Sequence, residues 1–269
     1  MEIRDIKACI RGRKSVRTYA GALTSEDREK LSSFLQTVEN PFGIPLAFRF
    51  LSAKEHGLTS GVLVGADEYI AAKVPRSPLF ELAYGYSFEA LCLYAQSIGV
   101  GTVMIAGTFN RKAFEKAMEV GEGEVMPLAT PVGYPAEKRS IREKALRRVV
   151  GADKRLPFGE LFYENDFTAP LSEAYDGRFR TALEMVRLAP SAVNKQPWRA
   201  VVCGDTVHFY KKSAKSLAHE ELDIQAVDMG IALAHFDLTL KEEGVFGKFV
   251  EKPPAFDCDG LSYSISYEG

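Results

Sequence analysis

Two long apolar segments constrain the fold of this chain more than any other feature of its sequence. The first, Phe80 to Ile98, carries large apolar residues at helical spacing over a wide arc, and Gly99 follows where a helix C-cap belongs. The second, Asp228 to Glu243, repeats this pattern, and aligning the two segments pairs Gly85 with Gly230. A helix that is apolar around most of its circumference is buried. We therefore expect the first helix to be central and the second to be its copy.

The elements around these two helices also recur in the same order. In the first half of the chain, a helix is followed by a strand-like run from Ala47 to Leu51. In the second half, a helix is followed by a similar run from Ala200 to Cys203. The seam falls near Glu164 to Pro170. We therefore predict an internal duplication, with residues 1–165 as the first half and residues 166–269 as the second, together forming one compact unit.

Composition and charge exclude several classes of protein. Of 269 residues, 46% are hydrophobic and 26% are charged, which is typical of soluble globular proteins. The formal net charge of −2 gives no general reason to bind nucleic acid or a membrane surface. The N-terminus lacks the apolar region of a signal peptide, and there is no run of about 18 apolar residues. We expect a cytoplasmic protein with no nucleic-acid and no membrane partner.

The cysteines and histidines show no spacing typical of a metal site. Four cysteines are far apart, and four histidines form neither an HxxxH nor an HExxH pattern. Cys9, Cys92 and Cys203 lie in apolar runs and are expected to pack as small core residues. A metal site is therefore not expected.

A short basic run near the N-terminus allows two interpretations. It contains Arg13, Lys14, Ser15 and Arg17. The more ordinary interpretation is a basic face in contact with solvent. The functional one is an anion site, because guanidinium groups and a serine hydroxyl together can hold a phosphate.

A polar loop, Leu188 to Arg199, holds the only tryptophan of the chain. Pro190 ends the preceding amphipathic helix, because the residue before a proline avoids the α region. The donors of Ser191, Asn194 and Gln196 follow. Such a loop is often a helix–strand connector whose polar residues cap their own backbone.

Both motifs resemble segments of the flavin-dependent nitroreductase family. The loop is similar to the family segment APSxxNxQPW, and the basic run is similar to the RxSxR element that opens these proteins. The positions that match are Arg13, Ser15, Arg17, Ala189, Pro190, Ser191, Asn194, Gln196, Pro197 and Trp198. The chain is most similar to the single-chain, Thermotoga-type subgroup, in which one polypeptide takes the place of two subunits.

The resemblance implies that FMN binds non-covalently between the two halves, with Ile105, Ala106 and Gly107 near the flavin N5. A basic residue after Tyr134 would hold the phosphate, and Arg155, Lys154 and Arg139 remain alternatives. The residues implied to bind the cofactor are Arg13, Lys14, Ser15, Arg17, Ala106, Gly107, Arg155, Arg139, Pro190, Ser191, Asn194 and Gln196.

The same resemblance implies an oxidoreductase. Hydride would pass from NAD(P)H through the flavin N5 to a small, electron-poor acceptor such as a nitroaromatic or quinone, in a ping-pong mechanism. No side chain is required as a nucleophile. The alternatives are a flavin-binding protein with little turnover and a pseudoenzyme that kept the fold for an interaction.

The implied fold is α+β, a three-layer α/β/α arrangement that forms an internally duplicated pseudo-dimer with a mostly antiparallel sheet. The chain would then act as a monomer or a weak homodimer.

Overall fold

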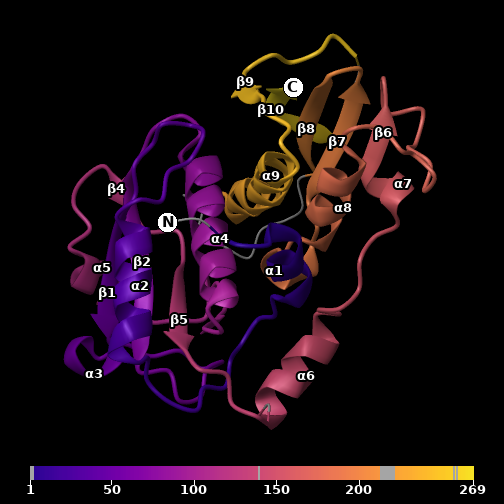
Figure 1. Ribbon diagram of the computed structural model, residues 1–269. Helices are drawn as coiled ribbons and strands as arrows, with labels where there is room; N and C mark the ends of the chain where they lie inside the picture. The colour runs from indigo at the N-terminus through magenta and orange to yellow at the C-terminus, as the bar shows by residue number, and fades with distance from the viewer. Residues whose placement is uncertain (1–2, 139, 213–221, 257, 259) are drawn as a thin grey trace.

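The computed structural model describes residues 3–138, 140–212, 222–256, 258 and 260–269. Its centre is a pair of packed helices, α4 (Phe80–Ser97) and α9 (Ile224–Glu242), as the two apolar segments predicted (Figure 1). The helix α9 begins four residues earlier than expected, because the side chain of Asp223 accepts a hydrogen bond from Ala226 N and caps it. No helix within the described residues is long and apolar enough to cross a membrane.

The two central helices cross at a pair of glycines. A Cβ atom added to Gly85 would collide with the carbonyl oxygen of Val227, and one added to Gly230 would collide with that of Leu82. Each glycine thus faces the residue three positions before the other glycine. This reciprocal contact is what a two-fold relation between the halves requires, so the crossing supports the predicted duplication.

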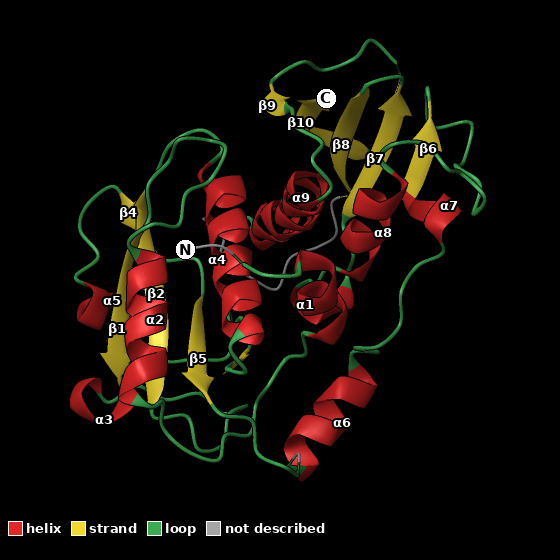
Figure 2. Cartoon of the chain, viewed as in Figure 1, coloured by secondary structure: helices red, strands yellow, loops and turns green. Residues whose placement is uncertain are grey.

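The strands form two sheets, one on each side of the helix pair (Figure 2). The first sheet has the order β1-β2-β5-β3, with β4 also paired to β2, and all its pairs are antiparallel. Its strands are β1 (Ala47–Ser52), β2 (Glu68–Pro75), β3 (Gly101–Thr102), β4 (Glu124–Val125) and β5 (Ala129–Gly133).

The second sheet has the order β6-β7-β8-β10-β9 and is antiparallel except for the pair β6–β7. Its strands are β6 (Phe162–Glu164), β7 (Trp198–Cys203), β8 (Thr206–Lys212), β9 (Lys248–Val250) and β10 (Leu261–Glu268). The fold is therefore α+β and mostly antiparallel, as predicted, with the strands divided between two sheets. The strand β6 belongs to the second sheet although it precedes the predicted boundary between residues 165 and 166.

Helices cover the first sheet on both faces. Along β2, Ile70 and Ala72 pack with α2 and α4, whereas Tyr69 and Ala71 face the opposite way, toward Phe114 of α5. This alternation is the period of two that a strand buried on both faces shows. The remaining helices are α1 (Ile6–Gly12), α2 (Ser25–Leu35), α3 (Ala53–His56), α5 (Arg111–Met118), α6 (Ile141–Val149), α7 (Phe158–Leu161), α8 (Arg180–Leu188) and the 3-10 turn η1 (Ala192–Asn194).

Candidate functional site

The basic run extends along the first half after α1 ends. Ser15 pairs with Thr102 of β3, and Val16 N donates to Thr102 O at 2.9 Å. Gly101 allows this approach, because a Cβ atom there would lie 2.9 Å from the Val16 side chain. The backbone of the run is therefore held against the strand.

Arg13 is anchored by a buried carboxylate of the central helix. Its Nε lies 3.5 Å from Glu89 Oε1, and Glu89 has no exposed surface. The same oxygen lies 2.8 Å from Nε2 of His235 on α9. His235 Nδ1 lies 2.8 Å from the carbonyl oxygen of Met185, which can only accept, so Nδ1 carries a proton. Arg13 is thus connected to both central helices.

Guanidinium groups of the basic run gather in one region with those of the segment that follows α6. Burial lowers the pKa of Arg17, Glu143 opposes this effect, and the charges of Arg147 and Arg13 add to it. Burial likewise lowers the pKa of Arg155, and the charge of Arg13 is the next cause. Since Arg13 affects both groups, the basic run of the first half and Arg155 lie within reach of each other's charge.

The helix α6 is bound to the basic run by its own carboxylate. Glu143 is buried, and Thr18 Oγ1 donates to it at 2.9 Å. Ser140 N donates to Thr18 Oγ1 at 3.1 Å. Arg147, on the same helix, pairs with Asp153. The helix α6 and the residues after it therefore bring both positive and negative groups to this region, at the lower edge of Figure 1.

The polar loop adopts a backbone that few side chains tolerate. Val193, Asn194 and Gln196 have φ angles of 45°, 57° and 48°, in the left-handed region where non-glycine residues are uncommon. The loop is held by α9, because Ala192 N donates to both carboxylate oxygens of Asp228 at 3.0 and 3.1 Å. Burial raises the pKa of Asp228 well above its usual value. Residues held in this way concentrate at functional loops.

The structure brings Arg155 into contact with Asn194 of the polar loop. Arg155 Nη1 lies 3.5 Å from Asn194 Oδ1, and its Nη2 donates to Leu188 O at 3.2 Å. Its Nε is buried, with no partner among the described residues. Asn194 Nδ2 donates to the carbonyl oxygens of Gly151 and Lys154 at 2.8 and 3.0 Å. Arg155 rather than Lys154 is therefore the basic residue whose side chain contacts the loop.

Ser191 and Gln196 form bonds within and beside the loop. Ser191 Oγ accepts from Gln196 N at 2.9 Å, and Gln196 Oε1 accepts from Leu156 N at 2.9 Å. Ser191 can still donate its hydroxyl proton. Pro190 is partly buried.

The other predicted residues lie in the first half or outside the described part of the chain. Ile105 is buried and pairs with Ala129, whereas Gly107 is exposed. Ala106 O accepts from Arg111 Nη2 at 2.8 Å. Lys14 is exposed. Arg139 lies outside the described residues.

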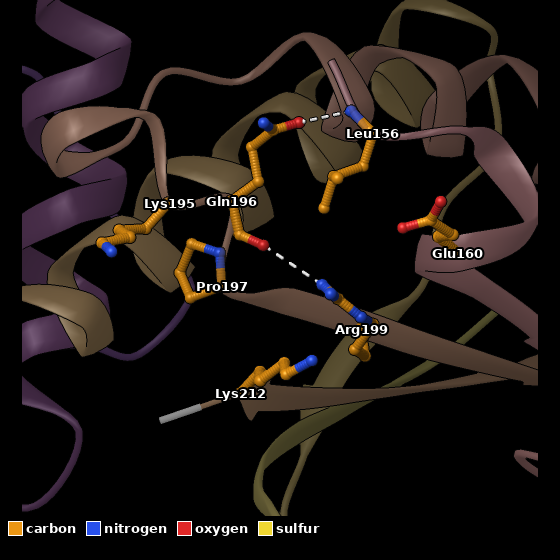
Figure 3. Close-up of a pocket in the computed structure, with 7 residues that line it drawn as sticks. All are labelled: Leu156, Glu160, Lys195, Gln196, Pro197, Arg199 and Lys212. Carbon is orange, nitrogen blue, oxygen red and sulfur yellow. Dashed lines mark hydrogen bonds between the residues drawn. The ribbon is translucent and has the colours of Figure 1, made fainter. Parts of the chain in front are cut away.

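A cavity of about 290 Å³ lies on the outer side of the polar loop (Figure 3). The sequence did not predict this cavity, because its walls come from three separate segments of the chain. The only local signal was Arg199, a charge directly after a buried tryptophan. The lining residues are Leu156, Glu160, Lys195, Gln196, Pro197, Arg199 and Lys212.

Comparisons with known proteins give a family and a fold. A family model described as "Putative TM nitroreductase" matches residues 5–240. A putative nitroreductase from Thermotoga maritima aligns with 100% of this chain and 95% of its own, with a TM-score of 0.66 and 19% identity. No curated protein matches significantly.

Two further solved structures align with about half of the chain. An FMN-dependent nitroreductase from Clostridium difficile covers 50% of this chain and 90% of its own, with 15% identity and a TM-score of 0.43. A nitroreductase with bound FMN from Bacteroides fragilis covers 51% and 92%, with 14% identity and a TM-score of 0.41.

Proposed function

Because the chain belongs to the family described as "Putative TM nitroreductase", we propose that it is an oxidoreductase that binds FMN between its two halves. The substrates would be NAD(P)H and a small electron-poor acceptor, such as a nitroaromatic or a quinone. When bound, FMN supplies the hydride-transfer chemistry. The protein's part is to hold and orient the cofactor.

One observation carries this proposal: guanidinium groups of the basic run share one region with Arg155, which contacts the polar loop of the second half. Arg13 and Arg17 come from the basic run, and Arg155 comes from beside the polar loop. Like charges that are partly buried together cost free energy, which a dianionic phosphate would offset. The unpartnered Nε of Arg155 is a further donor that a phosphate oxygen could use. Arg17 and Arg155 would therefore suit the phosphate end of FMN.

The remaining donors fit the other parts of the cofactor. Ser15 and Ser191 have hydroxyl groups that suit ribityl and ring oxygens. Arg13 would place positive charge at the ring, and its bond to Glu89 would keep the guanidinium oriented. Positive charge near the ring stabilises a reduced, anionic flavin. Lys14, Ala106, Gly107, Pro190, Asn194 and Gln196 remain part of the proposed contact set.

Absorbance spectroscopy of the purified protein with added FMN tests the proposal. We expect flavin absorbance to remain with the protein after desalting, and oxidation of NADH or NADPH when a quinone is added. Arg155→Gln and Arg13→Ala should each weaken FMN binding by about tenfold or more, because each removes a charge-assisted hydrogen bond. Lys112→Gln, which removes an exposed charge on α5, is the control. Unchanged FMN affinity in Arg13→Ala would remove that residue from the site.

A second function is favoured by the bonds that Asn194 already makes. Its amide nitrogen donates to two backbone carbonyls of the 151–154 turn, so that turn must move before this nitrogen can donate to a flavin. A flavin-binding protein with little turnover, or a pseudoenzyme, would tolerate such a turn. A yellow protein that oxidises neither NADH nor NADPH would identify the first, and a colourless protein that cannot be loaded with FMN would identify the second.

A further inference from the structure

The cavity on the outer side of the polar loop contains two cationic groups that face the same space. Arg199 lies at the start of β7 and Lys212 at the end of β8, and Lys212 N donates to Pro197 O at 2.7 Å. Figure 3 shows the guanidinium and the ammonium beside each other, whereas the ammonium of Lys195 extends away from them. The pairing of the two strands therefore places both side chains at the same cavity, Arg199 buried and Lys212 exposed.

Arg199 is a preorganised donor. The residue is 8% exposed, and its Nη1 donates to the carbonyl oxygens of Gln196 and Trp198 at 3.1 and 2.6 Å. These bonds use one nitrogen and leave Nε and Nη2 for a ligand. A guanidinium fixed in this way loses little entropy when it binds a planar or tetrahedral oxyanion.

The two charges have no carboxylate partner in the described part of the chain. Glu160 faces them across the cavity and acts on Arg199 only from a distance, since the two form no ion pair. For Arg199, which is buried, the lack of a paired counter-ion is costly. An anion placed between Arg199 and Lys212 would offset that cost.

We propose that this cavity binds the oxyanion head, a carboxylate or a phosphate, of a small organic molecule. Leu156 and Pro197 would contact its carbon part, and the volume of about 290 Å³ limits it to a small ligand. Glu160 would accept a hydrogen bond from a hydroxyl or amine of the ligand and would repel a second anionic group. This site adjoins the proposed FMN site, because Gln196 lines the cavity and also belongs to the proposed FMN contact set, but its two cationic groups, Arg199 and Lys212, are not part of that set.

Binding of inorganic phosphate and of acetate to the full-length protein tests this proposal. Titrations at constant ionic strength, followed by the backbone amide signals of Trp198 and Arg199 in nitrogen-15 NMR, should show saturable shifts. Tighter binding of phosphate would indicate a phosphate ester as the natural ligand, and tighter binding of acetate would indicate a carboxylate. Lys212→Gln should weaken binding about tenfold, because it removes one charge-assisted bond. Glu160→Gln should strengthen binding, because it removes a repulsive charge.

Two controls separate this site from its neighbours. Lys112→Gln makes the same charge change on the exposed face of α5 and should leave the shifts unchanged. Arg17→Gln removes a charge from the proposed FMN site and should also leave them unchanged. The proposal is wrong if neither anion gives a saturable shift at Trp198 and Arg199. It is also wrong if Arg17→Gln abolishes binding while Lys212→Gln does not affect it.

Discussion

Glu89 illustrates how one buried charge can serve both the core and the site. Its Oε1 lies 2.8 Å from Nε2 of His235 and 3.5 Å from Nε of Arg13, and the residue has no exposed surface. Its second oxygen is buried without a partner among the described residues. The carboxylate is therefore satisfied mainly by these two contacts. Its removal would leave Arg13, whose side chain is only 9% exposed, without its counter-ion.

We expect Glu89→Ala to lower the free energy of unfolding by about 3–5 kcal/mol, because breaking a buried pair leaves an uncompensated charge. Urea unfolding measures this change. Glu115→Ala is the matched control, since Glu115 also lies on a helix and pairs with Arg111 at 3.6 Å, but near the surface. It should cost about 0.3–0.5 kcal/mol. Equal losses in the two variants would show that the Glu89 pair contributes no more than a surface pair.

Asp228 gives a prediction for the dependence of stability on pH. Burial raises its pKa well above 3.8, so the folded state favours the protonated form. The resulting stabilisation is complete below 3.8 and is lost as pH rises from there through the raised pKa. Asp228→Asn removes this titration and keeps an acceptor for Ala192 N. The variant should therefore gain stability relative to the natural protein as pH rises, as measured by urea unfolding at several pH values. A constant difference across that range would contradict the predicted shift.

At the scale of elements, the crossing of α4 and α9 depends on two glycines. Inside a helix, alanine is normally more favourable than glycine by about 1 kcal/mol. At Gly85 and Gly230 the added Cβ would meet a backbone carbonyl of the other helix, which cannot turn away as a side chain could. We expect Gly85→Ala and Gly230→Ala each to destabilise the protein by about 3 kcal/mol or more, measured by thermal or urea unfolding.

Gly12→Ala is the control for these variants. Gly12 ends α1, and a Cβ there would lie 3.3 Å from the amide nitrogen of Gln96, a flexible side chain that can move. Its effect should be within about 0.5 kcal/mol. If Gly85→Ala were equally mild, the two helices would have to be free to separate, and the crossing would not define the fold.

Elements that repeat in the sequence could be predicted, and elements formed by distant contacts could not. Helical spacing and the alignment of Gly85 with Gly230 predicted the central pair and the duplication, because burial imposes a pattern on the residues themselves. The left-handed conformations of Val193 and Gln196 left no such pattern, and the loop that contains them is held by distant partners, Asp228 and Leu156. The cavity at Arg199 was missed for the same reason.

Among the predicted site residues, the same distinction holds. Arg13, Ser15 and Arg17 were found from a short motif within one segment. The contact of Arg155 with Asn194 joins residues 39 positions apart, and the sequence left Arg155, Lys154 and Arg139 as alternatives. The buried link from Arg13 through Glu89 to His235 joins three elements, and local spacing does not encode it.

At the scale of the whole molecule, the two halves share their cores. Leu82 and Tyr86 of α4 pack in the core cluster of the second half, and Val227 of α9 packs in that of the first. Tyr86 also donates to Asp237 Oδ2 at 2.5 Å across the helix pair. Neither half can therefore keep its core intact once the other has unfolded.

This sharing predicts that the chain unfolds as one cooperative unit. Trp198 is the only tryptophan and lies in the second half, so its fluorescence reports on that half alone. Far-ultraviolet circular dichroism reports on helices and strands of both halves. We expect the two signals to give the same urea midpoint and the same slope, which is the test of two-state unfolding. In Tyr86→Phe, which removes only the bond to Asp237, the midpoint should fall while the two signals still coincide, because the apolar packing across the pair remains. A circular dichroism transition that continues after Trp198 is fully exposed would mean that the first half is stable alone, and α4 would then need another way to cover its apolar surface.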